Sequence, residues 1–270
     1  MSGLRLSCSV SIAFFALATV SAAFQEPNFT AEQQREFLLN AKVVGSKPIG
    51  LGKTHPWRLT LSDGTVTHDA AFNIVDELKN VMKFSGGRTE LNFRDSYEYD
   101  IAAYELARLI GLDDMIPVTV ERQWEGKRGA LSWWLPVKMD ENKRTKENLQ
   151  PPNQEAWNRQ MHKVRVFTQL IYDTDRNRGN LLITEDWKIY MIDFTRAFRL
   201  NDKLETPSDL ERCDRQLLEK LRQLDGQELL NRTKPHLTKS EVKSLMARRD
   251  KIVKIFDQLI AQKGEDAVLY

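Results

Sequence analysis

Apolar and polar residues alternate in the first half of the chain and recur with helical spacing in the second half. Alternation is typical of half-buried strands, and it predicts strands over 57–61, 65–75, 116–124 and 130–136. One helix is expected among them, over 97–112, because its apolar residues share a face and Gly111 stands where a helix C-cap is favoured. The first half therefore reads as a sheet with one helix.

Pairs of capping residues mark where further helices begin. The three-residue spacing of a capping box occurs at Thr30 with Gln33, Ser208 with Glu211, and Thr238 with Glu241. Together with apolar stripes, these pairs predict helices over 30–40, 154–172, 208–224 and 238–263, and two short strand-like runs lie at 181–184 and 188–192. This order of elements predicts an α+β protein of two lobes, a small strand-rich N-lobe and a mostly helical C-lobe.

The boundary between the lobes is expected at the charged segment 137–153. That segment contains two prolines and has no apolar face. We therefore assign residues 24–136 to the N-lobe and residues 137–270 to the C-lobe.

Residues 1–23 have the pattern of a signal peptide. Arg5 precedes an apolar run at 10–20, and small residues follow at 21–23. The run is short for a transmembrane helix, although an uncleaved anchor is the alternative. We expect export to the periplasm or the extracellular space, with membrane contact only through the transient signal peptide. Cleavage leaves Cys213 as the only cysteine, so no internal disulfide can form.

The composition excludes some classes of protein. Of the 270 residues, 41% are hydrophobic and 29% are charged, which fits a soluble globular chain rather than a disordered one. The formal net charge is only +2 and the basic residues are dispersed, so no nucleic-acid partner is expected.

The polar stretch 173–194 resembles a calcium loop at first sight. Asp173, Asp175 and Asn177 occupy the first three ligand positions of an EF-hand. An EF-hand requires glycine at position six and glutamate at position twelve, but this chain has Arg178 and Thr184 there. A calcium loop is therefore not expected.

The stretch 49–54, IGLGKT, resembles a Walker A loop in the same incomplete way. The first glycine of that motif falls on Lys47, and a strand rather than a helix follows. A glycine-rich turn between two strands remains, which is another way of covering phosphates.

Phosphoryl transfer accounts better for the stretch at 173–194. A kinase catalytic loop has an aspartate, four residues and then an asparagine, with a metal-binding aspartate further on. Asp175 and Asn180 have that spacing, and Asp193 ends the strand-like run after them. A hairpin over 181–192 would bring Asn180 and Asp193 to the same end of two paired strands, where both can reach one magnesium ion.

These residues resemble the catalytic core of atypical kinases. Asp175-Arg176-Asn177, Asn180 and Asp193-Phe194 are similar to motifs of the phosphatidylinositol 3-/4-kinase-like, HipA-type and secretory-pathway (Golgi casein-kinase type) kinases. The resemblance is specific over about 165–199 and looser over 49–136. It implies a kinase-like fold, ATP as the bound nucleotide and Mg²⁺ (or Mn²⁺) as the metal.

The resemblance also implies roles for single residues. Asp175 would be the catalytic aspartate, and Asn180 and Asp193 the metal ligands. Gly50 and Gly52 would lie over the phosphates, and the linker at 136–139 would flank the adenine.

The chain departs from the kinase pattern in the N-lobe. The third strand should carry a lysine for the phosphates, and Asn73 stands at that place, with Lys79 or Lys83 as candidates to reach in. The helix should supply a glutamate, for which Asp100 is the nearest residue, with Glu98 and Glu105 as rivals.

The sequence thus predicts an exported atypical kinase-like protein. It would transfer a phosphoryl group, or alternatively an adenylyl group, from Mg-ATP to an unknown phospho-acceptor. The alternative is a catalytically inactive pseudokinase that binds a nucleotide or a protein partner, which the missing lysine favours.

Overall fold

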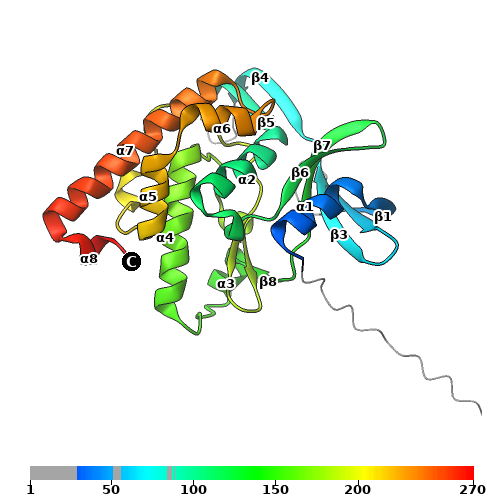
Figure 1. Cartoon of the computed structure of the whole chain (residues 1–270), viewed down its shortest axis with the longest axis horizontal. Helices are drawn as coiled ribbons and strands as arrows, with labels where there is room; N and C mark the ends of the chain where they lie inside the picture. The colour runs from blue at the N-terminus through cyan, green and yellow to red at the C-terminus, as the bar shows by residue number, and fades with distance from the viewer. Residues whose placement is uncertain (1–28, 51–55, 84–86, 88) are drawn as a thin grey trace, which may run out of the picture.

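The chain folds into a strand-rich lobe and a helical lobe (Figure 1). The computed structural model describes residues 29–50, 56–83, 87 and 89–270. The expected signal peptide and Gly52 lie outside the described residues. Within them, no helix combines the length and the apolar character needed to cross a membrane.

The N-lobe is built on a five-stranded antiparallel sheet with the order β1-β2-β3-β7-β6. Its strands are β1 (Lys42–Pro48), β2 (Trp57–Ser62), β3 (Thr67–Asn73), β6 (Thr119–Trp124) and β7 (Lys127–Trp133). The expected strands are confirmed, and β1 is an addition to them. The turn between β6 and β7 is shorter than expected, because Glu125 and Gly126 both have positive φ, as a two-residue type I′ turn requires.

Two helices cover this sheet. Helix α1 (Ala31–Asn40) packs against β6 and β7, and its capping box is formed by Thr30 and Gln33 as expected. Helix α2 (Glu98–Ile110) ends at Gly111, whose φ of 73° confirms the expected C-cap. Helix α2 contacts β6 and β7 as well as α5 and α6, so it joins the two lobes.

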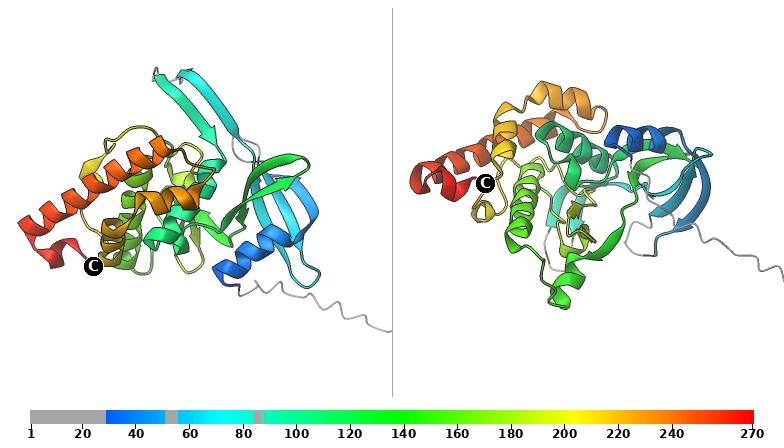
Figure 2. Two further views of the ribbon diagram at one scale, coloured as in Figure 1. Left: turned by 45° about the horizontal axis from the view of Figure 1, so that its top comes forward. Right: turned by 60° about the horizontal axis from the view of Figure 1, so that its bottom comes forward.

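A two-stranded hairpin projects from the body of the protein (Figure 2). It consists of β4 (Asp76–Lys83) and β5 (Thr89–Ser96), neither of which was expected. Seven of the eight β4 residues are exposed, so the strand has no buried face and shows no alternation of apolar and polar residues.

The charged segment 137–153 also forms regular structure. It contains β8 (Val137–Asp140) and α3 (Glu141–Lys146), whose N-cap is Asp140. Strand β8 pairs with β9 (Leu181–Thr184), which pairs with β10 (Ile189–Met191). The hairpin expected over 181–192 is therefore confirmed, with a third strand added beside it.

The C-lobe is otherwise helical. Its helices are α4 (Gln154–Ile171), α5 (Arg215–Gln223), α6 (Gly226–Thr233), α7 (Lys239–Lys263) and α8 (Glu265–Val268). The helix expected from Ser208 was wrong, because the chain makes only a short 3₁₀ turn there and α5 starts after Asp214. Cys213 instead pairs with the C-terminal segment through its backbone, which keeps 210–214 extended.

Candidate active site

A cavity of about 480 Å³ lies between the N-lobe sheet and the three-stranded sheet of the C-lobe. Ala71 and Asn73 of β3 line one wall, and Asn180, Leu182 and Asp193 line the opposite wall. The linker residues Trp133, Trp134, Leu135 and Val137 also line it. The wall is apolar apart from a few polar groups, which is the usual composition of a small-molecule site.

The β9–β10 hairpin fixes the position of two expected metal ligands. Leu181 pairs with Met191, and the backbone N–H of Ile192 donates to the carbonyl of Asn180 at 3.1 Å. Asn180 and Asp193 therefore flank the same end of the hairpin, and both face the cavity. The side-chain N–H of Asn180 donates to the carbonyl of Asp175 at 3.0 Å, which leaves the amide oxygen of Asn180 available as a ligand.

Asp175 lies in the loop that follows α4, next to Asn180 of the cavity wall. Its side chain is 41% exposed and forms an ion pair with Arg196 at 3.1 Å. A groove of about 570 Å³ borders the other side of the loop and is lined by Thr174, Arg199, Asn201 and β5 residues. Its neighbour Thr174 lines the groove, whereas Asn180, which hydrogen-bonds to the Asp175 carbonyl, lines the cavity.

Arg176 is a structural residue. Its Nη1 donates to the carbonyls of Asn180 and Ile192 at 2.9 and 2.6 Å. Its Nη2 lies 2.5 Å from a carboxylate oxygen of Asp173, whose side chain is fully buried. Arg176 therefore connects the loop before β9 to the residues that flank both strands of the hairpin.

Asp193 carries several features of a cation ligand. Its φ of 58° places it in the left-handed region, which aspartate tolerates better than most residues. Residues with such backbone angles are frequent at functional sites. The hydroxyl of Thr195 donates to its carboxylate at 3.0 Å. Desolvation raises the pKa of Asp193, and the nearby charges of Asp173 and Asp175 raise it further.

These residues fit a divalent cation held jointly with phosphate. A carboxylate that is crowded by other carboxylates is stabilised when a cation binds, and Mg²⁺ prefers few protein oxygens plus phosphate oxygens. Among the described residues, no group of three or more His, Cys, Asp or Glu side chains is gathered as a metal cage. That finding is compatible with a site of one carboxylate and one amide.

Asn73 occupies the end of β3 and pairs with helix α2. Its amide donates to one carboxylate oxygen of Asp100 at 3.2 Å, and the other oxygen accepts from the backbone N–H of Phe194 at 2.7 Å. Burial, followed by the charge of Asp193, raises the pKa of Asp100 to about 7. Asn73 and Asp100, the residues expected at the places of the kinase lysine and glutamate, therefore contact each other, and Asp100 links α2 to the Asp193-Phe194 step.

The alternative candidates for the lysine and the glutamate of the site do not line the cavity. Lys79 is on the projecting hairpin and pairs with Glu77 at 2.7 Å, and neither Lys79 nor Lys83 lines the cavity. Glu98 pairs with Arg94, and Glu105 pairs with Arg35. No lysine or arginine lines the cavity among the described residues.

The glycine-rich segment lies between β1 and β2 in the sequence, and its residues 51–55 are outside the described residues. Ile49 and Pro56 close its base with a backbone hydrogen bond of 2.8 Å, and both line the cavity. Gly50 is next to Ile49 but is not itself in the wall, and a Cβ at Gly50 would meet no atom within 4 Å.

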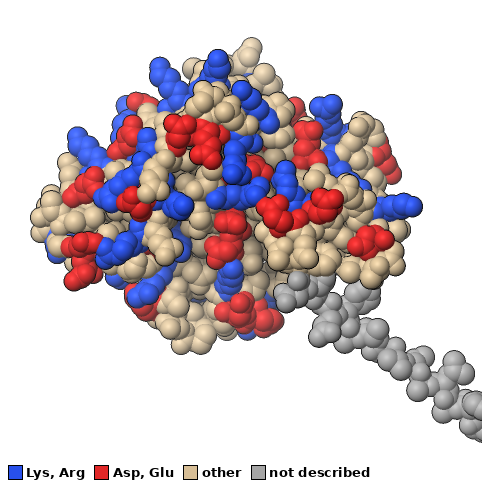
Figure 3. Space-filling view, in the orientation of Figure 1, with Lys and Arg blue, Asp and Glu red and all other residues tan. Residues whose placement is uncertain are grey.

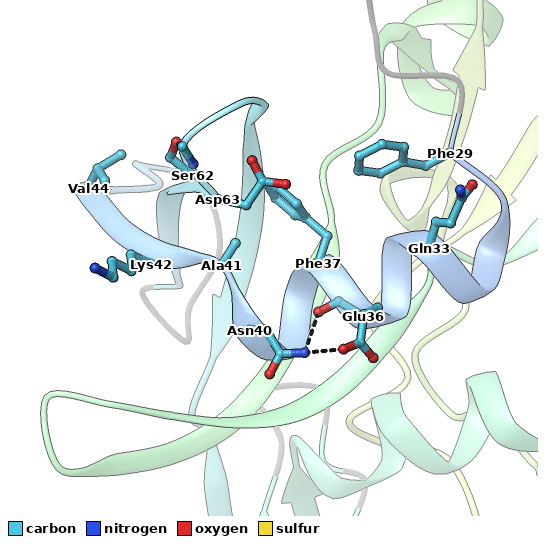
Figure 4. A pocket seen from close by; sticks show the side chains of 11 residues that line it. Phe29, Gln33, Glu36, Phe37, Asn40, Ala41, Lys42, Val44, Ser62 and Asp63 are labelled. Atoms are coloured by element: carbon cyan, nitrogen blue, oxygen red, sulfur yellow. Dashed lines mark hydrogen bonds between the residues drawn. The ribbon is translucent and has the colours of Figure 1, made fainter.

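Another cavity of the N-lobe is separate from this site. It has a volume of about 640 Å³ and lies between α1 and the β1–β2 edge (Figure 4). Phe29, Phe37 and Val44 supply its apolar wall, and the nearby Asn40 and Glu36 hydrogen-bond to each other. It gathers no constellation of catalytic groups. Over the face shown in Figure 3, basic and acidic side chains are interspersed.

The site makes the metal-free protein sensitive to pH. Burial raises the pKa of Asp100 in the folded protein to about 7, well above the usual range of a carboxyl group, so its contribution to stability is lost as the pH rises from about 4 to 7. Because Asp193 raises this pKa, we expect Asp193→Asn to stabilise the metal-free chain by about 1 kcal/mol at pH 8 and less at pH 5.

Urea unfolding with a chelator at pH 5 to 8 measures this effect. Asp186→Asn is the control, because the hydroxyl of Thr184 lowers the pKa of Asp186 and its charge therefore stabilises the fold. An equal effect of Asp193→Asn at all pH values would contradict the coupling.

Comparisons with known proteins concern the fold. No protein-family model matches the chain, and no curated protein matches it. The solved structure of hydra Fam20 with sugar has a TM-score of 0.66 and 14% identity, covering 89% of this chain and 92% of that chain. A Golgi casein kinase has a TM-score of 0.63 and 12% identity, covering 88% of this chain and 77% of that chain.

Two more solved structures extend the likeness. The Golgi casein kinase with Mn/ADP bound has a TM-score of 0.60 and 11% identity, covering 88% of this chain and 78% of that chain. The Helicobacter pylori proinflammatory kinase CtkA has a TM-score of 0.54 and 12% identity, covering 84% of this chain and 98% of that chain. The predicted two-lobed fold is therefore confirmed: the chain is an atypical kinase-fold protein.

Proposed function

We propose that this protein transfers a phosphoryl group from Mg²⁺- or Mn²⁺-bound ATP to a hydroxyl acceptor. The observation that carries the proposal is the joint placement of Asn180 and Asp193 at one end of a hairpin, facing a cavity, with Asp175 beside them. The Golgi casein kinase of similar fold binds Mn/ADP, which supports a nucleotide in this cavity.

Asp175, Asn180 and Asp193 have different roles in the proposed phosphoryl transfer. The acceptor oxygen forms a bond to the γ-phosphorus, and the bond from that phosphorus to the β,γ-bridging oxygen breaks. The electron pair of the broken bond stays on ADP, and the hydroxyl proton passes to the carboxylate of Asp175 and then to water. Asn180 and Asp193 would hold the divalent cation, which supplies charge neutralisation for the phosphates.

The cavity walls suit the rest of the nucleotide. Trp134, Leu135 and Val137 form an apolar part of the wall at the linker between the lobes, which suits an adenine. The turn that contains Gly50 would cover the phosphates. The apolar linker and the polar hairpin lie at different parts of one cavity, as a nucleoside triphosphate requires.

The second candidate function is a pseudokinase that binds nucleotide or a protein partner without turnover. Asn73 is the observation that favours it, because a neutral amide cannot neutralise phosphate charge as a lysine does. The intact set of Asp175, Asn180 and Asp193 favours the enzyme.

We also infer that the mature protein acts outside the cytoplasm. This inference rests on the signal-peptide pattern of residues 1–23, and a kinase of similar fold belongs to the Golgi. Expression with a C-terminal tag, followed by N-terminal sequencing, should find a mature chain that starts near residue 24. A cytoplasmic chain that begins at Met1 would contradict it.

A thermal-shift titration tests the proposed site. We expect ATP to raise the melting temperature only with Mg²⁺ or Mn²⁺, and we expect Asp193→Ala to abolish this rise because it removes the charged ligand. Asp257→Ala is the control, since Asp257 lies on α7 and pairs with Arg222 away from the cavity. A shift that survives in Asp193→Ala would sink the metal assignment, and no shift with any nucleotide would sink the proposal.

A further inference from the structure

Arg196 holds the catalytic loop to the N-lobe. Its Nε donates to a carboxylate oxygen of Asp95 at 2.9 Å, and its Nη1 donates to a carboxylate oxygen of Asp175 at 3.1 Å. Asp95 is buried at the base of the projecting hairpin. A single guanidinium therefore joins β5 to the residue that would accept the proton.

The rest of Arg196 is fixed as well. Its carbonyl accepts from the backbone N–H and the hydroxyl of Thr174, at 3.4 and 3.1 Å. Its guanidinium carbon lies 5.6 Å from the centre of the Phe93 ring. The side chain is 22% exposed, so it is partly buried and still accessible from the site.

The guanidinium lies beside the residue that would orient the acceptor. Its Nη1 is 3.1 Å from the carboxylate of Asp175, and the backbone carbonyl of Asp175 accepts from the side chain of Asn180 at 3.0 Å. The γ-phosphoryl group must pass between the acceptor, oriented by Asp175, and the cation held by Asp193. Arg196 stands beside that path.

The proposed reaction needs a side-chain cation that the cavity lacks. The transferred group carries negative charge on three oxygens, and kinases neutralise part of it with a lysine or an arginine. Asn73 supplies no charge, and no described residue with a positive charge lines the cavity. Other nearby arginines are engaged, because Arg176 binds backbone carbonyls and Arg199 pairs with Glu90.

We propose that Arg196 contacts the γ-phosphoryl group of the bound nucleotide and supplies the charge that Asn73 does not. This inference rests on the proposed nucleotide site and goes beyond it by assigning the triphosphate specificity to one residue. Asp95 is the positioning residue that holds the guanidinium at this place. On nucleotide binding, the Nη atoms of Arg196 turn from Asp175 to the phosphoryl oxygens while Nε keeps its bond to Asp95.

Binding of a triphosphate and a diphosphate distinguishes this role from a structural one. Calorimetry with Mn²⁺ would measure ADP and the β,γ-imido analogue of ATP, in the wild type and in Arg196→Ala. Charge-assisted hydrogen bonds are the strong ones, so we expect Arg196→Ala to bind the triphosphate about tenfold more weakly and ADP with unchanged affinity. Arg196→Lys should recover part of the loss, since lysine keeps the positive charge but lacks the paired N–H donors of the guanidinium.

Controls separate the possible outcomes. Arg35→Ala removes a half-buried arginine that pairs with Glu105 outside the cavity, and it should change neither affinity. Asp95→Asn should weaken triphosphate binding alone. Equal weakening of ADP and the triphosphate in Arg196→Ala, or no weakening, overturns the role of Arg196 while leaving the nucleotide site intact. A wild-type chain that binds neither nucleotide overturns the nucleotide site as well.

Discussion

Asp175→Asn is expected to lower the rate of phosphoryl transfer about a thousandfold, the usual contribution of general acid–base catalysis. Asparagine keeps the shape of the side chain and the position beside Arg196, but it cannot accept the acceptor's proton. The substitution does not touch Asn180 or Asp193, so affinity for ADP, which lacks the γ-phosphoryl group, should stay unchanged. Loss of turnover without loss of binding is the signature of a group that acts in the reaction rather than in ground-state binding.

The measurement does not require the natural acceptor. Transfer from γ-labelled ATP to water, to the chain itself and to a panel of hydroxyl compounds can be followed in the wild type and the variant. Asp257→Asn is the matched control, because Asp257 is an exposed aspartate paired with an arginine at 2.6 Å. Wild-type turnover that persists in Asp175→Asn would remove Asp175 from the mechanism. Metal-dependent nucleotide binding with no wild-type turnover would favour the pseudokinase.

The β9–β10 hairpin could be predicted from sequence because its signals are local. The distance from Asp175 to Asn180 and the two apolar runs before Asp193 lie within 20 residues of each other. Strand pairing over so short a loop follows from the pattern itself. The same holds for α2 and α7, where an apolar stripe and the capping residues at Gly111 and Thr238 agree.

The N-lobe part of the site could not be predicted so well, because it depends on contacts between distant residues. Asn73 and Asp100 are 27 residues apart, and the sequence left Glu98 and Glu105 open as rivals. Only the packing of α2 shows that Asp100 is the residue that meets Asn73. Asp100 is 8% exposed, and its carboxylate accepts from the backbone N–H of Phe194. Periodicity shows which face of a helix is buried, but not which polar residue on it meets another lobe.

The exposed strands β4 and β8 could not be predicted, for a different reason. Strand β4 has no buried face, and β8 begins a charged segment that is held by pairing to β9. Strand prediction relies on burial of one face, so a strand whose stability comes from backbone pairing leaves no pattern. Arg196 was also not singled out from the sequence, because its contact with Asp95 depends on where β5 lies in the fold.

Arg176→Met is expected to destabilise the protein by about 3 kcal/mol or more, the usual cost of breaking a buried ion pair. The side chain of Arg176 is 6% exposed, and that of its partner Asp173 is fully buried. Removal of the guanidinium leaves the Asp173 carboxylate without its counter-charge. It also removes the arginine donor from the carbonyl of Ile192 and one of the two donors to the carbonyl of Asn180. Methionine retains the apolar stem against Phe194, so lost packing contributes little.

Urea unfolding of the nucleotide-free chain measures the loss. Arg159→Met is the control, because Arg159 pairs with Glu155 at a surface where both side chains are half exposed, and such pairs add little stability. The double variant Asp173→Asn with Arg176→Met should regain part of the stability, since it removes the orphaned charge. A loss in Arg176→Met no greater than in Arg159→Met would show that the hairpin keeps its place without this arginine. The geometry of the cavity wall would then depend on strand pairing alone.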